Sequence, residues 1–89
     1  MIERETEIVN RLGLHARAAA KLVHTASGFQ SRVTVAKDGE EVDAKSILGV
    51  LLLAASQGTR VIIRSDGADE EQAMEAVTDL IAGRFGEES

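Results

Sequence analysis

The start of the chain alternates between two kinds of side chain, and this alternation constrains the fold more than any other feature. The residues fall into two sets, Ile2, Arg4, Thr6 and Ile8 on one side and Glu3, Glu5 and Glu7 on the other. A period of two is typical of a β-strand that is buried on one face. Because the acidic face needs water, the pattern predicts a sheet that other elements cover on one side only.

Three further segments have the character of strands. Residues 32–37 alternate in the same way, and Asp38-Gly39 after them is a typical two-residue hairpin turn that leads into a return strand at residues 41–43. Residues 61–64 form another short apolar segment. With the opening strand, these segments predict four strands in all.

Three other segments repeat their apolar residues with the period of a helix. The first begins at Ala16 and stops at Gly28, the second covers residues 47–57, and the third follows Asp69. Their inward stripes are expected to be Ala19, Leu22, Val23 and Ala26 in the first, Val50, Leu53 and Ala54 in the second, and Ala73, Val77, Leu80 and Ile81 in the third.

The expected helix ends complete the architecture. Ser46 is suited to cap the second helix, and Asp69 to cap the third, with Gln72 at the reciprocal position of a capping box. The last residues, 86–89, are expected to be frayed. The order strand, helix, strand, strand, helix, strand, helix predicts an α+β fold with an antiparallel sheet covered by helices on one side.

Composition narrows the classes of function. The 89 residues predict a single domain, residues 1–89, and the absence of cysteine excludes disulfides and thiolate metal sites. His15 and His24 alone do not make a zinc site, so we expect no metal and no cofactor. A net charge of −5 argues against nucleic acid as a partner. The charged start and the lack of a membrane-spanning apolar run predict a cytoplasmic protein without membrane insertion, which we expect to be monomeric.

A histidine stands where a polar turn gives way to an alanine-rich helix, in the segment Gly13-Leu14-His15-Ala16-Arg17. The first turn of a helix has spare backbone N–H groups, here those of Ala16 and Arg17, and it favours bound anions. A neutral imidazole is a nucleophile, and Arg17 adds a charged planar fork that fits phosphate oxygens. The segment predicts a histidine that carries phosphate; the alternative is a histidine that ends a loop beside a solvated arginine.

Two segments together resemble a known family. The His15 segment resembles the active-site signature of the histidine-containing phosphocarrier protein (HPr) family of the bacterial phosphoenolpyruvate-dependent phosphotransferase system. Residues 44–53, with the sequence Ala-Lys-Ser-Ile-Leu-Gly-Val-Leu-Leu-Leu, resemble the regulatory-serine segment of that family. The resemblance covers essentially the whole chain. It implies an open-faced β-sandwich, with a four-stranded antiparallel sheet and three helices on one face.

The resemblance also implies a relay. Enzyme I, charged by phosphoenolpyruvate, would phosphorylate His15 on Nδ1, Arg17 would stabilise the phosphoryl group, and Enzyme IIA-type proteins would accept it. The protein would then be a carrier and not an enzyme in its own right. Ser46 would be a site for an ATP-dependent HPr kinase/phosphorylase as well as a helix cap. One residue departs from the family pattern, because Ala18 stands where a proline is usual.

The second helix carries more apolar residues than one buried stripe needs. We expect the surplus to be exposed as a docking surface for Enzyme I and the acceptors, formed by Ile47, Leu48, Leu51 and Leu52. Arg17, Lys21 and His24 would form a polar flank beside it. The alternative is a helix that is buried on both sides.

Two other functions remain open at this point. A nitrogen-branch phosphocarrier would use the same chemistry with a different Enzyme I and different acceptors. A small α+β regulatory or ligand-binding domain without phosphotransfer would have no need of His15 together with Arg17.

Overall fold

The four strands pair into one antiparallel sheet in the order β1-β4-β2-β3 in the computed structural model, which describes all 89 residues. The elements are, in chain order, β1 (Ile2–Glu7), α1 (Ala16–Ser27), β2 (Arg32–Lys37), β3 (Glu40–Asp43), α2 (Ile47–Leu53), β4 (Arg60–Asp66), α3 (Glu70–Ala82) and the short 3-10 helix η1 (Arg84–Gly86). The predicted α+β class and element order are confirmed. No helix is long and apolar enough to cross a membrane.

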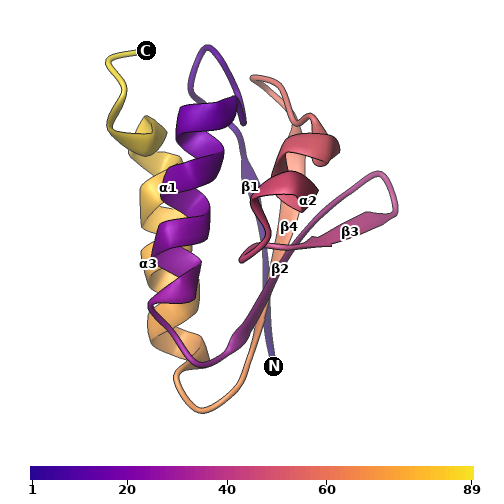
Figure 1. The fold of residues 1–89 in the computed structure, drawn as a ribbon, viewed down its shortest axis with the longest axis vertical. Helices are drawn as coiled ribbons and strands as arrows, with labels where there is room; N and C mark the ends of the chain where they lie inside the picture. Colours follow the sequence, from indigo (N-terminus) through magenta and orange to yellow (C-terminus); the bar gives the residue numbers. More distant parts are fainter.

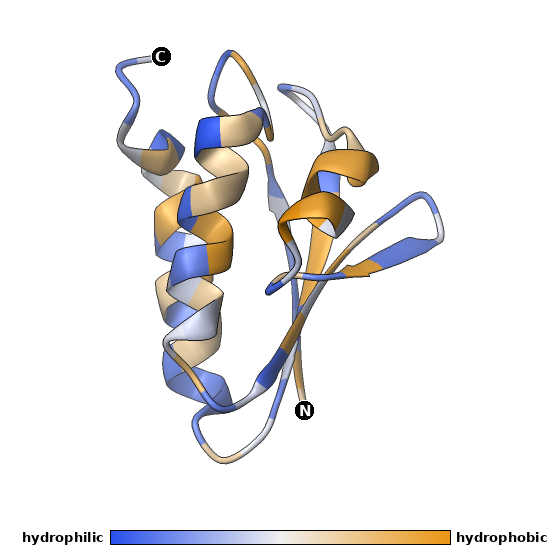
Figure 2. Cartoon of the chain, viewed as in Figure 1, coloured by the Kyte–Doolittle hydropathy of each residue, from blue (hydrophilic) through white to orange (hydrophobic).

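All three helices lie on one side of the sheet (Figure 1). Helix α3 packs on β1 and β4, α2 packs on β3 and β2, and α1 packs against both α2 and α3. The core between these layers includes Leu22, Val33, Val35, Val50, Leu53, Val61, Ile63, Val77 and Ile81. Helix α2 consists of apolar residues along nearly its whole length (Figure 2), more than one side that faces this core requires.

The other side of the sheet is charged, as the alternation at the start of the chain predicted. Arg64 on β4 donates to Glu3 on β1 and to Glu41 on β3, both at 2.8 Å. Thr34 on β2, which lies between them, donates to the same oxygen of Glu41 (2.8 Å). The bond from Arg64, more than the one from Thr34, holds the pKa of Glu41 below its usual value. These side chains stabilise an open face in water without a second layer.

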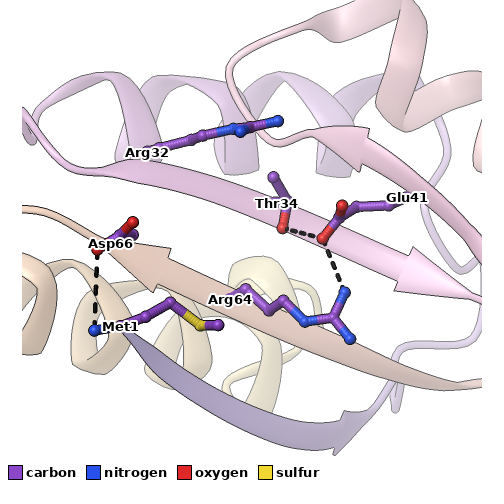
Figure 3. A pocket seen from close by; sticks show the side chains of 6 residues that line it. All are labelled: Met1, Arg32, Thr34, Glu41, Arg64 and Asp66. Carbon is purple, nitrogen blue, oxygen red and sulfur yellow. Dashed lines mark hydrogen bonds and ion pairs between the residues drawn. The ribbon is translucent and has the colours of Figure 1, made fainter.

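A shallow hollow of about 150 Å³ lies on this open face (Figure 3). It is lined by Met1, Arg32, Thr34, Glu41, Arg64 and Asp66. Most of its charges are paired with one another, Glu41 with Arg64 and the amino group of Met1 with Asp66 (3.8 Å). Its one hydroxyl, on Thr34, is bonded to Glu41. Arg32 is the one charged group of the lining without a partner, and the hollow lies on the side of the sheet away from the helices.

Helix α2 ends earlier than the sequence predicted. It stops at Leu53, because Ala54 adopts a left-handed conformation (φ 54°) and donates its N–H to the carbonyl of Leu51 (3.1 Å). Val50 and Leu53 are buried as expected, whereas Ala54 is exposed and does not belong to the inward set. The early turn lets Ala55 enter the core instead.

Asp69 stands at the N-cap position of α3, as predicted, but the predicted capping box with Gln72 is wrong. The carboxylate of Asp69 caps no helix and accepts hydrogen bonds from the N–H groups of Gln30 and Ser31 (both 2.9 Å) and from the Ser31 hydroxyl. Gln72 is exposed, and Glu70 instead accepts from the N–H of Gly67 (3.1 Å). Asp69 therefore joins the start of α3 to the loop between α1 and β2, a contact that no local pattern announces.

The end of the chain is ordered, in contrast to the frayed tail that we predicted. Phe85 is fully buried, and Arg84 and Phe85 both have positive φ (58° and 55°), which turns the chain back after α3. Residues 87–89 then run to the loop before α1, where Arg11 donates its N–H to the carbonyl of Ser89 (3.0 Å). Figure 1 shows the C-terminus and this loop at the same end of the molecule.

Asp69 gives the fold a pH dependence that can be measured. The hydrogen bonds from Ser31 and Gln30 lower its pKa, so the unfolded chain binds more protons than the folded chain in acid. Stability should fall as the pH drops from about 4, the usual aspartate value, towards the lower pKa of the folded state. Asp69→Asn should flatten this slope in urea unfolding at several pH values, although Glu41, Glu70 and Glu87 contribute in the same direction.

Asp79→Asn is the matched control, because Asp79 is exposed on α3 and its side chain makes no hydrogen bond. It should keep the wild-type slope. A wild-type slope in Asp69→Asn would contradict the role given to this carboxylate.

Candidate functional site

The loop between β1 and α1 is fixed against the segment that follows α2. Gly13 has a φ of 66°, and a Cβ atom at this position would lie 2.5 Å from the carbonyl oxygen of Ala55. The next residue, Leu14, is buried and donates its N–H to the same oxygen (2.9 Å). Only glycine permits both the backbone conformation and the close approach. The loop that carries His15 is therefore held directly against the segment that follows α2.

His15 stands at the N-cap of α1 but does not cap it with its side chain. Its backbone is extended (φ −74°, ψ 178°), and its carbonyl accepts the N–H of Ala19 (2.8 Å). The N–H groups of Ala16, Arg17 and Ala18 have no acceptor within the chain. Such a helix start attracts anions through its free donors and its dipole.

A carboxylate from the opposite end of the chain holds the imidazole of His15. Oε2 of Glu87 is bonded to Nε2 of His15, and Oε1 of Glu87 accepts from Nδ2 of Asn10 (3.0 Å). Asn10 is fully buried and also donates to the carbonyl of Gly13 (2.8 Å). The bond from Asn10, followed by that from His15, holds the pKa of Glu87 below its usual value. The imidazole is 27% exposed, and its Nδ1 has no partner in the chain.

These groups surround an open hollow of about 440 Å³. It is lined by Arg11, Leu12, His15, Ala16, Arg17, Glu87, Glu88 and Ser89. Arg17 is exposed and pairs with no carboxylate of the chain, whereas Glu87 is occupied by its own two hydrogen bonds. An imidazole, two guanidinium groups and a helix start thus meet at one place, which suits a phosphoryl group.

Most of the residues predicted for docking are exposed, but one of them, Lys21, is bonded within the chain. The four apolar ones are exposed and form what we call the α2 patch: Ile47 (45%), Leu48 (63%), Leu51 (37%) and Leu52 (70%). Helix α2 is therefore not buried on both sides. His24 is exposed on α1, but Lys21 is not free, because its Nζ donates to the carbonyl of Phe85 (2.6 Å). Lys21 thus holds the C-terminal turn.

Ser46 is the N-cap of α2, as predicted. Its Oγ accepts the N–H of Gly49 at 3.2 Å, and its side chain is half-buried at the edge of the α2 patch. The hydroxyl is therefore close to the residues at the start of the patch, Ile47 and Leu48.

Sequence reasoning missed Asn10 and Glu87. Seventy-two residues separate His15 from Glu87, and seventy-seven separate Asn10 from Glu87. No spacing rule joins such distant positions, and Glu87 lies in a segment whose composition is typical of a frayed end. The one signal in the sequence is Phe85, a large apolar residue near the end of the chain. Its side chain is buried and anchors the tail, so the residues after it have a fixed position.

The comparisons with known proteins agree with this geometry. The family model of the PTS HPr component phosphorylation site matches residues 2–83. The chain belongs to the HPr family. The phosphocarrier protein HPr of Xylella fastidiosa (strain Temecula1) is 56% identical to this chain over 89 residues. The alignment covers 100% of both proteins. As a member of the HPr family, the chain is a phosphocarrier of the phosphotransferase system.

Two solved structures support the same assignment. HPr-C-His from Thermoanaerobacter tengcongensis superposes with a TM-score of 0.97 at 50% identity, over 100% of both chains. An HPr dimer from the same organism superposes with a TM-score of 0.79 at 50% identity, over 98% of this chain and 100% of that one. The monomer that we predicted is therefore not the only state found among HPr structures.

The alanine that departs from the HPr pattern has a simple place in this structure. Ala18 lies in the first turn of α1, where its N–H has no acceptor within the chain and its side chain is fully buried. A proline at this position removes no hydrogen bond. The first turn forms with alanine because alanine has the highest helix propensity.

The close approach at Gly13 can be tested with a matched pair of variants. Gly13→Ala combines a strained φ with a clash against backbone, so it should destabilise the protein by at least ~3 kcal/mol and weaken the Leu14–Ala55 hydrogen bond. Gly39→Ala has a similar φ of 84° but no atom within 4 Å, so it should destabilise by only ~1 kcal/mol.

Denaturant unfolding gives the two free energies, and hydrogen exchange of the Leu14 amide reports the local bond. Equal losses of stability in the two variants would show that the approach to Ala55 is not a constraint.

Proposed function

We propose that this chain accepts a phosphoryl group on Nδ1 of His15 from phosphorylated Enzyme I and passes it to Enzyme IIA-type acceptors in the sugar phosphotransferase system. The observation that carries the proposal is the partly exposed imidazole at the start of α1, with Nε2 bonded to Glu87 and Nδ1 without a partner. It is joined by the free N–H groups of the first turn and by the unpaired guanidinium of Arg17.

The transfer needs little acid–base chemistry. The lone pair of Nδ1 forms the new N–P bond, while the bond between phosphorus and the donor group of Enzyme I breaks and its electron pair stays with Enzyme I. Arg17 and the N–H groups of Ala16 and Arg17 stabilise the charge on the phosphoryl oxygens. The exposed position suits a carrier, because a group bound in a closed pocket would be harder to give away.

The α2 patch is the surface on which we expect Enzyme I and the acceptors to dock. It is apolar, exposed and next to the His15 loop, since Gly13 and Leu14 contact Ala55 just after α2. Exposed apolar residues gathered in one place are typical of protein interfaces. Arg17 and His24 provide the polar flank on α1, whereas Lys21 is occupied by Phe85.

Ser46 is the site at which we expect regulation by an HPr kinase/phosphorylase. Its Oγ already lies at a helix start, where a phosphate is tolerated by the free N–H groups and the dipole. Nearly two negative charges beside Ile47 and Leu48 would weaken docking by desolvation and by repulsion of an acidic partner. Phosphorylation of Ser46 would thus act on the interface and not on the chemistry of His15.

The proposal is tested by mixing the protein with Enzyme I and phosphoenolpyruvate labelled on its phosphoryl group. We expect an acid-labile label that is absent in His15→Ala and present in His24→Ala, since His24 lies away from the hollow. The same mixture with a nitrogen-branch Enzyme I separates the two branches by their rates. No label with an Enzyme I that labels another HPr protein would refute the proposal.

A single charge on the α2 patch should separate docking from chemistry. Leu48→Asp should raise the KM of Enzyme I for this protein about ten-fold, because the substitution removes apolar contact from the centre of the interface and adds an unpaired charge there. The thermal midpoint should stay near that of the wild type, since Leu48 is 63% exposed. Gln72→Asp adds the same charge at an exposed site on α3 and should leave KM unchanged. Unfolding of Leu48→Asp would mean that the residue belongs to the core.

A further inference from the structure

We propose that Glu87 is a positioning residue, which holds the proton of His15 on Nε2 and so presents the lone pair of Nδ1 to the phosphoryl donor. This inference rests on the proposed function, because it assigns the device that prepares His15 for that reaction. The C-terminal segment would then be part of the phosphorylation site, although it is the part of the chain farthest from His15 in sequence.

Both oxygens of the Glu87 carboxylate are committed. Oε1 accepts from Nδ2 of Asn10 at 3.0 Å, and Oε2 is bonded to Nε2 of His15. Nδ2 of Asn10 also donates to the carbonyl of Gly13 (2.8 Å), so both of its hydrogens are used. Because Asn10 is fully buried in the loop that carries His15, the direction of the carboxylate is set by that loop.

The tail that carries Glu87 is anchored on three sides. Phe85 is fully buried, Nζ of Lys21 donates to its carbonyl (2.6 Å), and the N–H of Arg11 donates to the carbonyl of Ser89 (3.0 Å). Arg84 and Phe85 hold positive φ angles of 58° and 55°, which residues other than glycine adopt only when their surroundings impose it. The turn thus holds strain in order to bring Glu87 to His15.

The chemistry follows from the fact that a carboxylate only accepts hydrogen bonds. A neutral imidazole that meets it through Nε2 must carry its proton there, which leaves the lone pair on Nδ1. When Nδ1 forms the N–P bond, Nε2 keeps its proton and the ring becomes cationic. The negative charge of Glu87 then stabilises that cation from the nitrogen opposite the phosphoryl group. No proton enters or leaves in this step, so no further reactant is needed.

The same geometry predicts what an isosteric substitution does. In Glu87→Gln, Asn10 still requires an acceptor, because its second hydrogen is used by Gly13. The carbonyl of the introduced amide would therefore face Asn10, and its NH₂ group would face Nε2 of His15. An NH₂ donor favours the tautomer with the proton on Nδ1, which removes the lone pair needed for transfer. In Glu87→Ala, neither tautomer is selected by the tail.

The experiment measures tautomer and transfer separately. Nitrogen-15 chemical shifts of His15, at a pH high enough for a neutral ring, should report Nε2–H in the wild type, mainly Nδ1–H in Glu87→Gln, and a mixture in Glu87→Ala. The rate of labelling by Enzyme I should fall about ten-fold in Glu87→Gln, the lower end of the loss found when hydrogen-bond partners that orient metal-binding histidines are removed. Glu75→Gln is the control, since Glu75 is exposed on α3, its side chain makes no hydrogen bond, and it does not line the hollow around His15.

Each outcome decides one question. Wild-type tautomer and rate in Glu87→Gln would overturn the role of Glu87 while leaving His15 as the phosphoryl acceptor. If Glu87→Gln changes the tautomer but Enzyme I labels neither the variant nor the wild type, the proposed function is refuted and the contact between Glu87 and His15 still sets the tautomer. A lower rate with the wild-type tautomer would make Glu87 a structural anchor of the tail and would also overturn the inference. A far-ultraviolet spectrum and a thermal midpoint for each variant exclude unfolding as the cause.

Discussion

The functional surface depends on one backbone hydrogen bond, from the N–H of Leu14 to the carbonyl of Ala55. Gly13 makes it possible, because any side chain there would collide with the same carbonyl. The bond joins the loop before α1 to the segment after α2, and it extends the contact that the pairing of β1 with β4 begins, since Ile8 also exchanges backbone hydrogen bonds with Gly58 and Thr59. The phosphoryl-carrying histidine that we propose and the apolar surface that we propose for its partners therefore keep a constant separation, which two proteins exchanging a phosphoryl group must rely on.

Much of the fold is readable from the sequence because the deciding forces act locally. The alternation in β1 requires a solvated face, Asp38-Gly39 supplies two consecutive positive φ angles for its hairpin, and Ser46 meets an N–H three residues away. The failures share a different cause. Asp69 satisfies distant N–H groups in preference to its own helix, and Ala54 turns early so that Ala55 can be buried, and both choices depend on segments far away in sequence.

The residues of the site also divide into those that local sequence predicts and those whose role depends on distant segments. His15 and Arg17 were predicted because a helix start and a guanidinium at short spacing carry their own physical argument. Asn10 and Glu87 were not, because their role exists only once the C-terminal turn has folded back. Lys21 was predicted as a docking residue and is not free for that role, again because of the folded C-terminal turn. Its position on α1 suggested a free cation beside the docking surface, but the folded tail uses it to hold the carbonyl of Phe85.

The path of the C-terminal segment has a practical consequence for anyone who handles this protein. Ser89 lies against Arg11, at the rim of the hollow that contains His15, whereas Met1 lies at the far end of the molecule (Figure 1). A purification tag, a fluorophore or a surface linker joined after Ser89 would be delivered to the rim of that hollow, beside Arg17 and Glu87. The same attachment joined before Met1 would extend from the distant end of the sheet and leave the approach to His15 clear.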